Sequence, residues 1–164
     1  MKSLRDLAVL VVALILQATF LYRFEIGGIR PDLLVAFVVY LGWMRGPIPG
    51  TVGGFMVGLI QDLDAPGPLG LNALSKTIVG FAVAKVGFRI HRANMGVRFA
   101  FFLFAMLAHD IIYFAASSLG DPALFAKEML TIALPSALYT AVVVLVLLGL
   151  VEHVWKRPLL VDEV

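Results

Sequence analysis

The chain has 164 residues, of which 61% are hydrophobic and only 15% are charged, and its mean hydropathy is +0.98. A soluble domain carries about 45–50% apolar and about 25% charged residues, and a soluble protein of this size has too small an interior to bury so much apolar surface. The composition therefore predicts an integral membrane protein with a single domain over residues 1–164. It excludes a soluble enzyme, a disordered tail and a nucleic-acid-binding protein, and the absence of cysteine excludes disulfides, thiol catalysis and cysteine-based metal sites.

Six apolar segments follow one another along the chain, separated by short connections rich in Gly, Pro and Arg. A helix needs about 20 apolar residues to cross the hydrocarbon core of a bilayer, and about 17 at the short end. All six segments meet or approach this length, which predicts an all-α membrane protein built as a bundle of six transmembrane helices. In the last segment Pro135 is expected to free the Thr131 carbonyl and to kink the helix. The predicted helices are Leu7–Tyr22, Pro31–Met44, Ile48–Leu63, Leu71–Phe88, Val97–Ser118 and Met129–Val151.

The first three segments each have an alternative interpretation. Residues 7–22 follow Lys2 and Arg5 as in a secretory signal peptide, but no convincing A-x-A cleavage site follows, so we expect a retained helix. The second and third segments have 14 and 16 residues, which is short enough for a re-entrant hairpin. We expect two full spans, because tilt or local thinning of the bilayer can absorb the shortfall.

The distribution of lysine and arginine predicts the orientation, since cytoplasmic loops carry an excess of both. With six spans and the N-terminus inside, nine basic residues lie on the cytoplasmic side and four on the outer side. This asymmetry predicts a multi-pass protein with both termini cytoplasmic. The inner set is Lys2, Arg5, Arg45, Lys85, Arg89, Arg92, Arg98, Lys156 and Arg157, and the outer set is Arg23, Arg30, Lys76 and Lys127.

Glycines recur every four residues around the third segment, at Gly46, Gly50, Gly54 and Gly58. In a membrane helix this spacing gives a flat strip against which a second backbone can pack closely. Pro47 suits the first turn of a helix, where a missing N–H costs little, so Gly46 is expected just outside the helix. The strip predicts helix packing within the protomer. Packing against another subunit, such as a second copy in a homodimer, is the alternative.

Polar and ionisable side chains occur at membrane depth from the third segment onward, where their cost suggests a function. An aspartate at a helix centre costs about 2.5–3.5 kcal/mol on insertion scales, so Asp110, midway along the fifth segment, must face protein or water. We expect it to pair with His109, Tyr113 or Lys76, with a ligand pocket and a proton relay as alternatives. Asp62 is a second candidate partner for Lys76, near the outer surface. The candidate polar cluster or pocket comprises Asp62, Asn72, Ser75, Lys76, His109, Asp110, Tyr113 and Tyr139.

Each sequence stretch that is similar to a catalytic or metal-binding motif lacks a required part of it. The stretch from Gly70 to Thr77 has a Ser-Lys-Thr ending but lacks the second glycine and the preceding strand of a phosphate-binding loop. Asp62 and Asp110 lack the GxGD context of an intramembrane aspartyl protease. The three histidines have no metal-ligand spacing. The sequence therefore predicts a protein that is not an enzyme and needs no cofactor or metal.

The middle of the chain carries four motifs in order: PDLL at residues 31–34, RGP at 45–47, GFMVGLIQD at 54–62 and GPLGLNAL at 67–74. In these motifs, and in length and number of apolar segments, the chain resembles the rod shape-determining MreD family of bacterial inner-membrane proteins. The last two segments agree with the family in hydropathy only. Nothing known of the family is therefore carried over to His109 or Asp110.

The resemblance implies a small, non-enzymatic subunit of the machinery that elongates rod-shaped bacteria, located in the cytoplasmic (inner) membrane among its lipids. It implies association with the bitopic protein MreC and, through MreC, with the peptidoglycan synthase pair and the MreB filaments. It also implies a six-helix fold similar to the substrate-binding subunits of energy-coupling-factor vitamin transporters. That similarity keeps a second hypothesis open, a substrate-binding subunit of a vitamin or small-molecule transporter, which would need a closed pocket lined by polar and aromatic groups.

Overall fold

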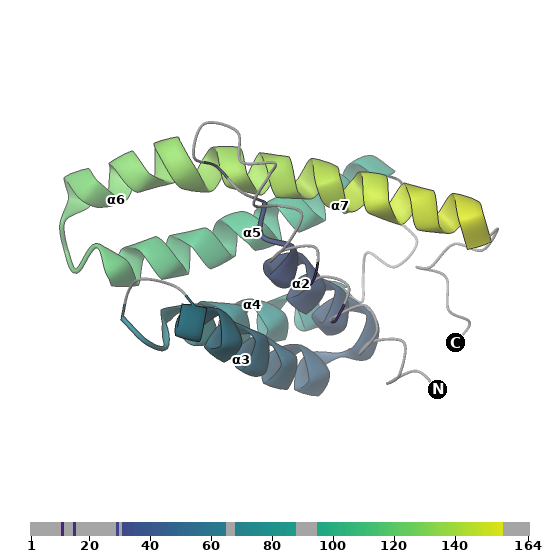
Figure 1. The fold of residues 1–164 in the computed structure, drawn as a ribbon, viewed down its shortest axis with the longest axis horizontal. Coiled ribbons are helices and arrows are strands. Elements are labelled where there is room, and N and C mark those ends of the chain that lie inside the picture. Colours follow the sequence, from purple (N-terminus) through teal and green to yellow (C-terminus); the bar gives the residue numbers. More distant parts are fainter. Residues whose placement is uncertain are drawn as a thin grey trace.

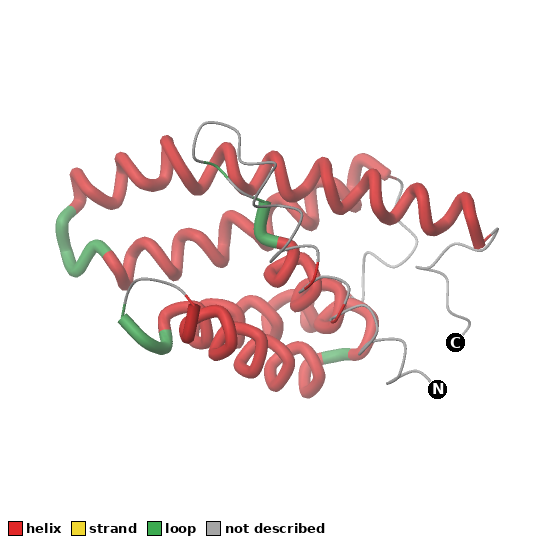
Figure 2. The backbone as a smooth tube through the Cα atoms, in the orientation of Figure 1, coloured by secondary structure: helices red, strands yellow, loops and turns green. Residues whose placement is uncertain are grey.

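The structure is a computed structural model that describes residues 31–64, 68–87 and 95–155, together with the single positions Val11, Ile15 and Ile29. Within these three ranges every regular element is helical (Figure 2), as the lengths of the apolar segments predict. The expected helix over residues 7–22 lies outside the described residues. The elements are α2 (Leu33–Arg45), α3 (Pro47–Asp64), α4 (Leu71–Gly87), α5 (Met95–Ser117), α6 (Pro122–Glu128), the π-helical turn η4 (Met129–Ala133) and α7 (Leu134–Trp155).

Helix α2 lies at the centre of the described fold. It packs against α3, α4, α5 and α7, and in Figure 1 it lies between the α3–α4 pair and the long helical stretches of α5 and α6–α7. Every residue from Leu33 to Val39 is buried, and Val38 and Val39 are 0% exposed. A helix that is apolar on all sides suits this position, because neighbouring helices cover the stretch from Leu33 to Val39 on every face.

One end of the bundle is closed by aromatic packing. The ring of Trp43 lies 5.3 Å from that of Phe101 and 5.8 Å from that of Phe102, centroid to centroid. The indole N–H of Trp43 donates a hydrogen bond to the Gly87 carbonyl at 3.0 Å, so the one polar atom of this buried side chain has a partner. These contacts join the C-terminal ends of α2 and α4 to the first half of α5.

The last predicted helix begins earlier than its apolar pattern suggested. We expected it to start at Met129, but helical structure begins at Pro122 and continues through η4 into α7 as one long rod (Figure 1). Asp121 caps this start, because its side chain accepts hydrogen bonds from the backbone N–H groups of Ala123 and Leu124 at 2.9 and 3.1 Å. The Gly-Asp-Pro sequence at 120–122 is therefore a helix start as well as a turn.

The expected disturbance at Pro135 takes the form of a π-helical turn. The N–H of Leu134 donates to the Met129 carbonyl, five residues back, and the π turn ends at Ala133, just before the proline. Proline has no N–H to offer its own turn of the helix, and a widened turn is one way in which a helix accommodates the missing bond. The Thr131 hydroxyl donates to the Lys127 carbonyl at 2.8 Å within the same stretch.

Two of the described helices are long and apolar enough to cross a membrane. They span Gly96–Ser117, with 22 residues, and Pro122–Leu147, with 26 residues. Helix α2 is apolar but has 13 residues, which corresponds to about 20 Å at 1.5 Å per residue. The number of spans contributed by the remaining helices stays a prediction.

Candidate functional site

The contact between α3 and α4 is set by glycines of α3. Gly50, Gly54 and Gly58 face α4, and a Cβ atom added at any of them would come within 3.0 Å of the α4 backbone. Gly54 lies against the carbonyl group of Lys76, and Gly58 lies against Ala73. The two backbones approach this closely because no side chain separates them. In this protomer the glycine strip is therefore occupied by α4.

Two glycines that sequence reasoning missed extend this contact to a third helix. A Cβ at Gly42 of α2 would come within 3.0 Å of the Gly80 carbonyl of α4, and a Cβ at Gly80 would meet the carbonyl of Gly50. Gly42 continues the four-residue spacing but lies in a different helix, and no local pattern marks Gly80. Gly46 does not share the packing role, because it joins α2 to α3 with a φ of +92° and an added Cβ would meet nothing within 4 Å. Its positive φ is what favours glycine there.

Asp62, in the last turn of α3, accepts hydrogen bonds from the N-terminus of α4. Its Oδ2 accepts from the backbone N–H groups of Gly70 and Ala73, and its Oδ1 accepts from the backbone and side-chain nitrogens of Asn72, each at 3.0 Å. The residue before α4 is Gly70, which has no side chain with which to cap the helix. Asp62 supplies that acceptor from the neighbouring helix, where the helix dipole also favours a negative charge.

Lys76 of α4 lies at the centre of what we call the charged network, the side chains of Asp32, Asn72, Lys76, His109 and Asp110. Lys76 is 0% exposed. Its Nζ donates to Asp32 Oδ2 at 3.4 Å and to Asn72 Oδ1 at 3.0 Å, and lies 3.1 Å from His109 Nε2. An ammonium group has three donors, so all of them are used, and they join α4 to α2 and to α5.

The tautomer of His109 follows from its two neighbours. Because the Lys76 ammonium can only donate, His109 Nε2 must accept, and the ring proton of the neutral imidazole must then be on Nδ1. Nδ1 lies 3.0 Å from Asp110 Oδ1, to which it donates. Tyr113 stacks on the His109 ring at a centroid distance of 6.2 Å. Among the described residues, His109 is thus the hydrogen-bond partner of Asp110, and Tyr113 is not.

Asp32 completes the charged network and was missing from the predicted cluster. Its Oδ1 caps α2 by accepting from the N–H groups of Leu34 and Val35 at 2.9 and 3.1 Å, while its Oδ2 faces Lys76. Its own backbone N–H donates to Thr140 Oγ1 of α7 at 2.9 Å. The available sequence signal was a Pro-Asp pair directly before an apolar run, which is typical of a helix start.

The other predicted residues lie beside the network or outside it. Ser75 is fully buried, but its hydroxyl donates to the Leu71 carbonyl of its own helix at 2.8 Å. Tyr139 lies half-buried on α7. The expected direct pair of Asp62 with Lys76 is wrong: Asn72 stands between them, donating to Asp62 through Nδ2 and accepting from Lys76 through Oδ1. One amide side chain serves both charges, because it carries a donor and an acceptor.

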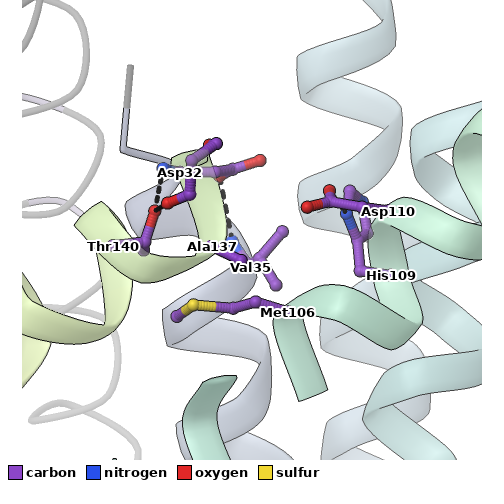
Figure 3. A pocket seen from close by; sticks show the side chains of 8 residues that line it. Asp32, Val35, Met106, His109, Asp110, Ala137 and Thr140 are labelled. Atoms are coloured by element: carbon purple, nitrogen blue, oxygen red, sulfur yellow. Dashed lines mark hydrogen bonds and ion pairs between the residues drawn. The ribbon is translucent and has the colours of Figure 1, made fainter. Parts of the chain in front are cut away.

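A small cavity borders the charged network between α2, α5 and α7. Its volume is about 10 Å³, which is room for about one water molecule. Figure 3 shows Asp32 and Asp110 on opposite sides of the cavity, with carboxylate oxygens directed into the space between them. The cavity is lined by Asp32, Val35, Met106, His109, Asp110, Ser136, Ala137 and Thr140.

The charged network can fix the relative positions of three helices. Burying an ammonium group is costly unless its hydrogen bonds are made, and here the acceptors come from α2, from α4 itself and from α5. Removing one partner of a buried ion pair typically costs about 3–5 kcal/mol. Within the described residues, no group of three or more His, Asp or Glu side chains is placed to hold a metal ion.

The fold is helical, two of its described helices are apolar enough to cross a bilayer, and a lysine, a histidine and three aspartates are interlinked in its interior, a combination that is typical of a helical membrane protein. The sequence model of the family described as rod shape-determining protein MreD matches residues 4–156, nearly the whole chain. The chain belongs to this family of bacterial membrane proteins that determine rod shape. Comparisons with curated proteins and with solved structures gave no match.

Proposed function

We propose that this protein is a non-enzymatic scaffold subunit of the bacterial cell-elongation complex, which builds peptidoglycan in rod-shaped cells. It binds the bitopic protein MreC and, through MreC, the peptidoglycan synthase pair and the MreB filaments. The family match over residues 4–156 carries this proposal. The proposed fold is a bundle of six transmembrane helices, the first over residues 7–22, similar to the substrate-binding subunits of energy-coupling-factor transporters.

In the proposed topology the protein crosses the inner membrane six times and has both termini in the cytoplasm. The described helices support this orientation, because basic residues lie at one end of the bundle. Arg45 ends α2, Lys85 lies in the last turn of α4, and Arg98 lies in the first turn of α5. The Trp43–Gly87 hydrogen bond holds the ends of α2 and α4 together at this end. An excess of basic residues is typical of the cytoplasmic side.

The cavity beside the charged network is too small to be the ligand pocket of a vitamin-binding transporter subunit. Pockets for small organic ligands measure about 300–1,000 Å³, whereas the cavity beside the charged network measures about 10 Å³. The Lys76 ammonium group makes its contacts with Asp32, Asn72 and His109 of the protein itself. This arrangement suits a protein whose buried charges hold its helices in place.

Recovery of MreC with the affinity-tagged, full-length chain from detergent-solubilised membranes tests the proposal. The wild-type chain should recover MreC. Gly54→Leu, which forces α3 away from α4, should lose both MreC and rod-shape complementation. Gly149→Leu is the matched control, because a Cβ at Gly149 of α7 meets nothing within 4 Å. A folded wild-type chain that recovers an ATP-hydrolysing coupling subunit instead of MreC would support the transporter hypothesis and overturn the scaffold.

A further inference from the structure

The hydrogen-bonded line from Lys76 through His109 to Asp110 is fully buried at one end and partly exposed at the other. Lys76 is 0% exposed, whereas the Asp110 side chain is 18% exposed and lines the cavity. Asp110 uses Oδ1 to accept from His109. Within the described part of the chain, its second carboxylate oxygen has no hydrogen-bond donor, although it lies in the middle of an apolar helix. The line therefore runs from a fully buried ammonium group to a carboxylate beside a cavity that has room for about one water molecule.

We propose that Lys76, His109 and Asp110 form a proton-exchange line through which the sealed lysine exchanges protons with a water molecule in the cavity. Lys76 gives one proton to His109 Nε2 while His109 gives its Nδ1 proton to Asp110 Oδ1. The products are a neutral Lys76 amine, the Nε2–H tautomer of His109 and a neutral Asp110 carboxylic acid, so no proton is gained or lost. Asp110 then passes its proton to the cavity water, which leaves as hydronium, and the reverse steps restore the ammonium group.

The geometry around His109 suits this transfer. Its two ring nitrogens lie 3.1 Å from the Lys76 Nζ and 3.0 Å from the Asp110 Oδ1, both within hydrogen-bonding distance. An imidazole can accept a proton on one nitrogen and release one from the other, which makes histidine a proton shuttle. In both states of the line the ring stays neutral, so no second positive charge forms beside Lys76.

The charged and titratable groups around the line come from four helices. Helix α3 contributes Asp62, which the Asn72 amide links to Lys76. Helix α2 contributes Asp32, α4 contributes Lys76, and α5 contributes Tyr113, which stacks on His109. Helix α7 contributes the hydroxyl-bearing residues Ser136 and Thr140 to the cavity lining, and neither titrates in the accessible pH range. Asp32 is thus the second carboxylate that lines the cavity, and it can orient a water molecule there by accepting one of its hydrogens.

The position of the proton sets how strongly α2 is held to α4. With Lys76 protonated, its Nζ forms an ion pair with Asp32 Oδ2 at 3.4 Å. A neutral amine keeps a hydrogen-bond donor but loses the ion pair, so proton transfer to Asp110 weakens the link between the central helix and α4. The line therefore couples the protonation of a group beside the cavity to the packing of the most buried helix.

NMR on the full-length chain in lipid nanodiscs, with ¹⁵N-labelled histidine and lysine, tests the proposal. Replacing His91 and His153 by glutamine leaves His109 as the single reporter, and Lys76→Met assigns the Lys76 signal. The ring nitrogen shifts should show the Nδ1–H tautomer as the main form. The Nζ protons of Lys76 should exchange with water faster than the backbone amides of α4, and Asp110→Asn should slow this exchange by about tenfold or more. An asparagine still accepts from His109 but cannot take up a proton.

Two controls keep the test decisive. Lys85 is exposed on α4, so its exchange should be the same in every variant. His109→Gln, which keeps a hydrogen-bonding side chain but cannot relay a proton, should slow Lys76 exchange as Asp110→Asn does. Wild-type exchange in a folded Asp110→Asn or His109→Gln variant would overturn the proposal. Exchange of Lys76 no faster than the α4 amides would overturn it too, since local unfolding would then supply the protons.

Discussion

Gly54 of α3 lies against the backbone carbonyl of Lys76, the same residue whose side chain is the centre of the charged network. The glycine strip and the charged network are therefore linked through Lys76, whose backbone packs on the strip and whose side chain belongs to the network. The strip fixes how closely α3 and α4 approach, and this position carries the Lys76 Nζ to acceptors on α2 and α5. A displacement of α4 therefore changes both contacts that link Lys76 to other helices, the one to Asp32 and the one to His109.

Gly54→Leu should destabilise the protein strongly. A side chain at this position overlaps backbone atoms rather than the end of a flexible side chain, so we expect a loss of about 3 kcal/mol or more in the free energy of unfolding. Thermal unfolding in detergent measures this loss. Gly149→Leu should unfold close to the wild-type temperature, and an equal effect of the two substitutions would contradict the close contact.

Asp62→Ala should cost more stability than removal of a comparable cap at the surface. The substitution leaves three backbone N–H groups and the Asn72 amide without their acceptor in a buried position, and each buried unsatisfied donor costs about 1–3 kcal/mol. Asp121→Ala is the matched comparison, because Asp121 caps α6 in an exposed position and an exposed cap is worth about 0.5–2 kcal/mol. Denaturant unfolding of both variants gives the difference, and equal losses would refute the role assigned to Asp62.

Lys76→Met should destabilise the protein by about 3–5 kcal/mol, because it removes the positive charge from a buried ion pair and leaves Asp32 facing no ammonium group. Methionine has a similar length, so the loss reflects charge rather than volume. The double variant Lys76→Met with Asp32→Asn should recover part of the loss, since the remaining buried charge is also removed. If the double variant lost as much free energy of unfolding as the two single variants together, Lys76 and Asp32 would not interact directly.

Asp110→Asn should leave the fold intact, whereas Asp110→Leu should not. Asparagine keeps an oxygen that accepts from His109 Nδ1, while leucine leaves that buried donor without a partner, at a cost of about 1–3 kcal/mol. Expression level and melting temperature of the two variants check the stability difference. Rod-shape complementation by the Asn variant then separates a structural role from one that needs the proton. A folded, assembled Asn variant that fails to restore shape would show that the carboxylate itself is required.

Single cysteines test the proposed topology, since the natural chain has none. Ala123→Cys lies at the exposed start of α6, on the proposed outer side, and Asn94→Cys directly precedes α5 in the sequence, on the proposed cytoplasmic side. An impermeant thiol reagent applied to intact spheroplasts should label position 123 and should label position 94 only after lysis. The reverse pattern would invert the proposed orientation.

The sequence by itself determined the class of protein and the positions of most helices. An apolar stretch of membrane length has no alternative to helical structure in lipid, because its backbone hydrogen bonds must be made within the segment. The predicted ranges for α2 to α5 therefore agree with the structure to within two residues at each end. The glycine spacing likewise identified Gly50, Gly54 and Gly58 as small residues on one face, because four-residue spacing and the helical period are both local properties.

The tertiary structure alone decided which polar groups meet. Lys76 contacts Asp32, which is 44 residues away in the sequence, and His109, which is 33 residues away. Gly80 packs against Gly50 because of the way in which α3 and α4 are aligned in the folded protein. Asp62 was recognised as a costly carboxylate, but three of its four donors are backbone N–H groups, which every residue except proline possesses and no sequence pattern distinguishes. Hydrogen bonds require atoms to lie within about 3 Å of one another, and that precision comes from the packing of helices, which the sequence of a single segment does not contain.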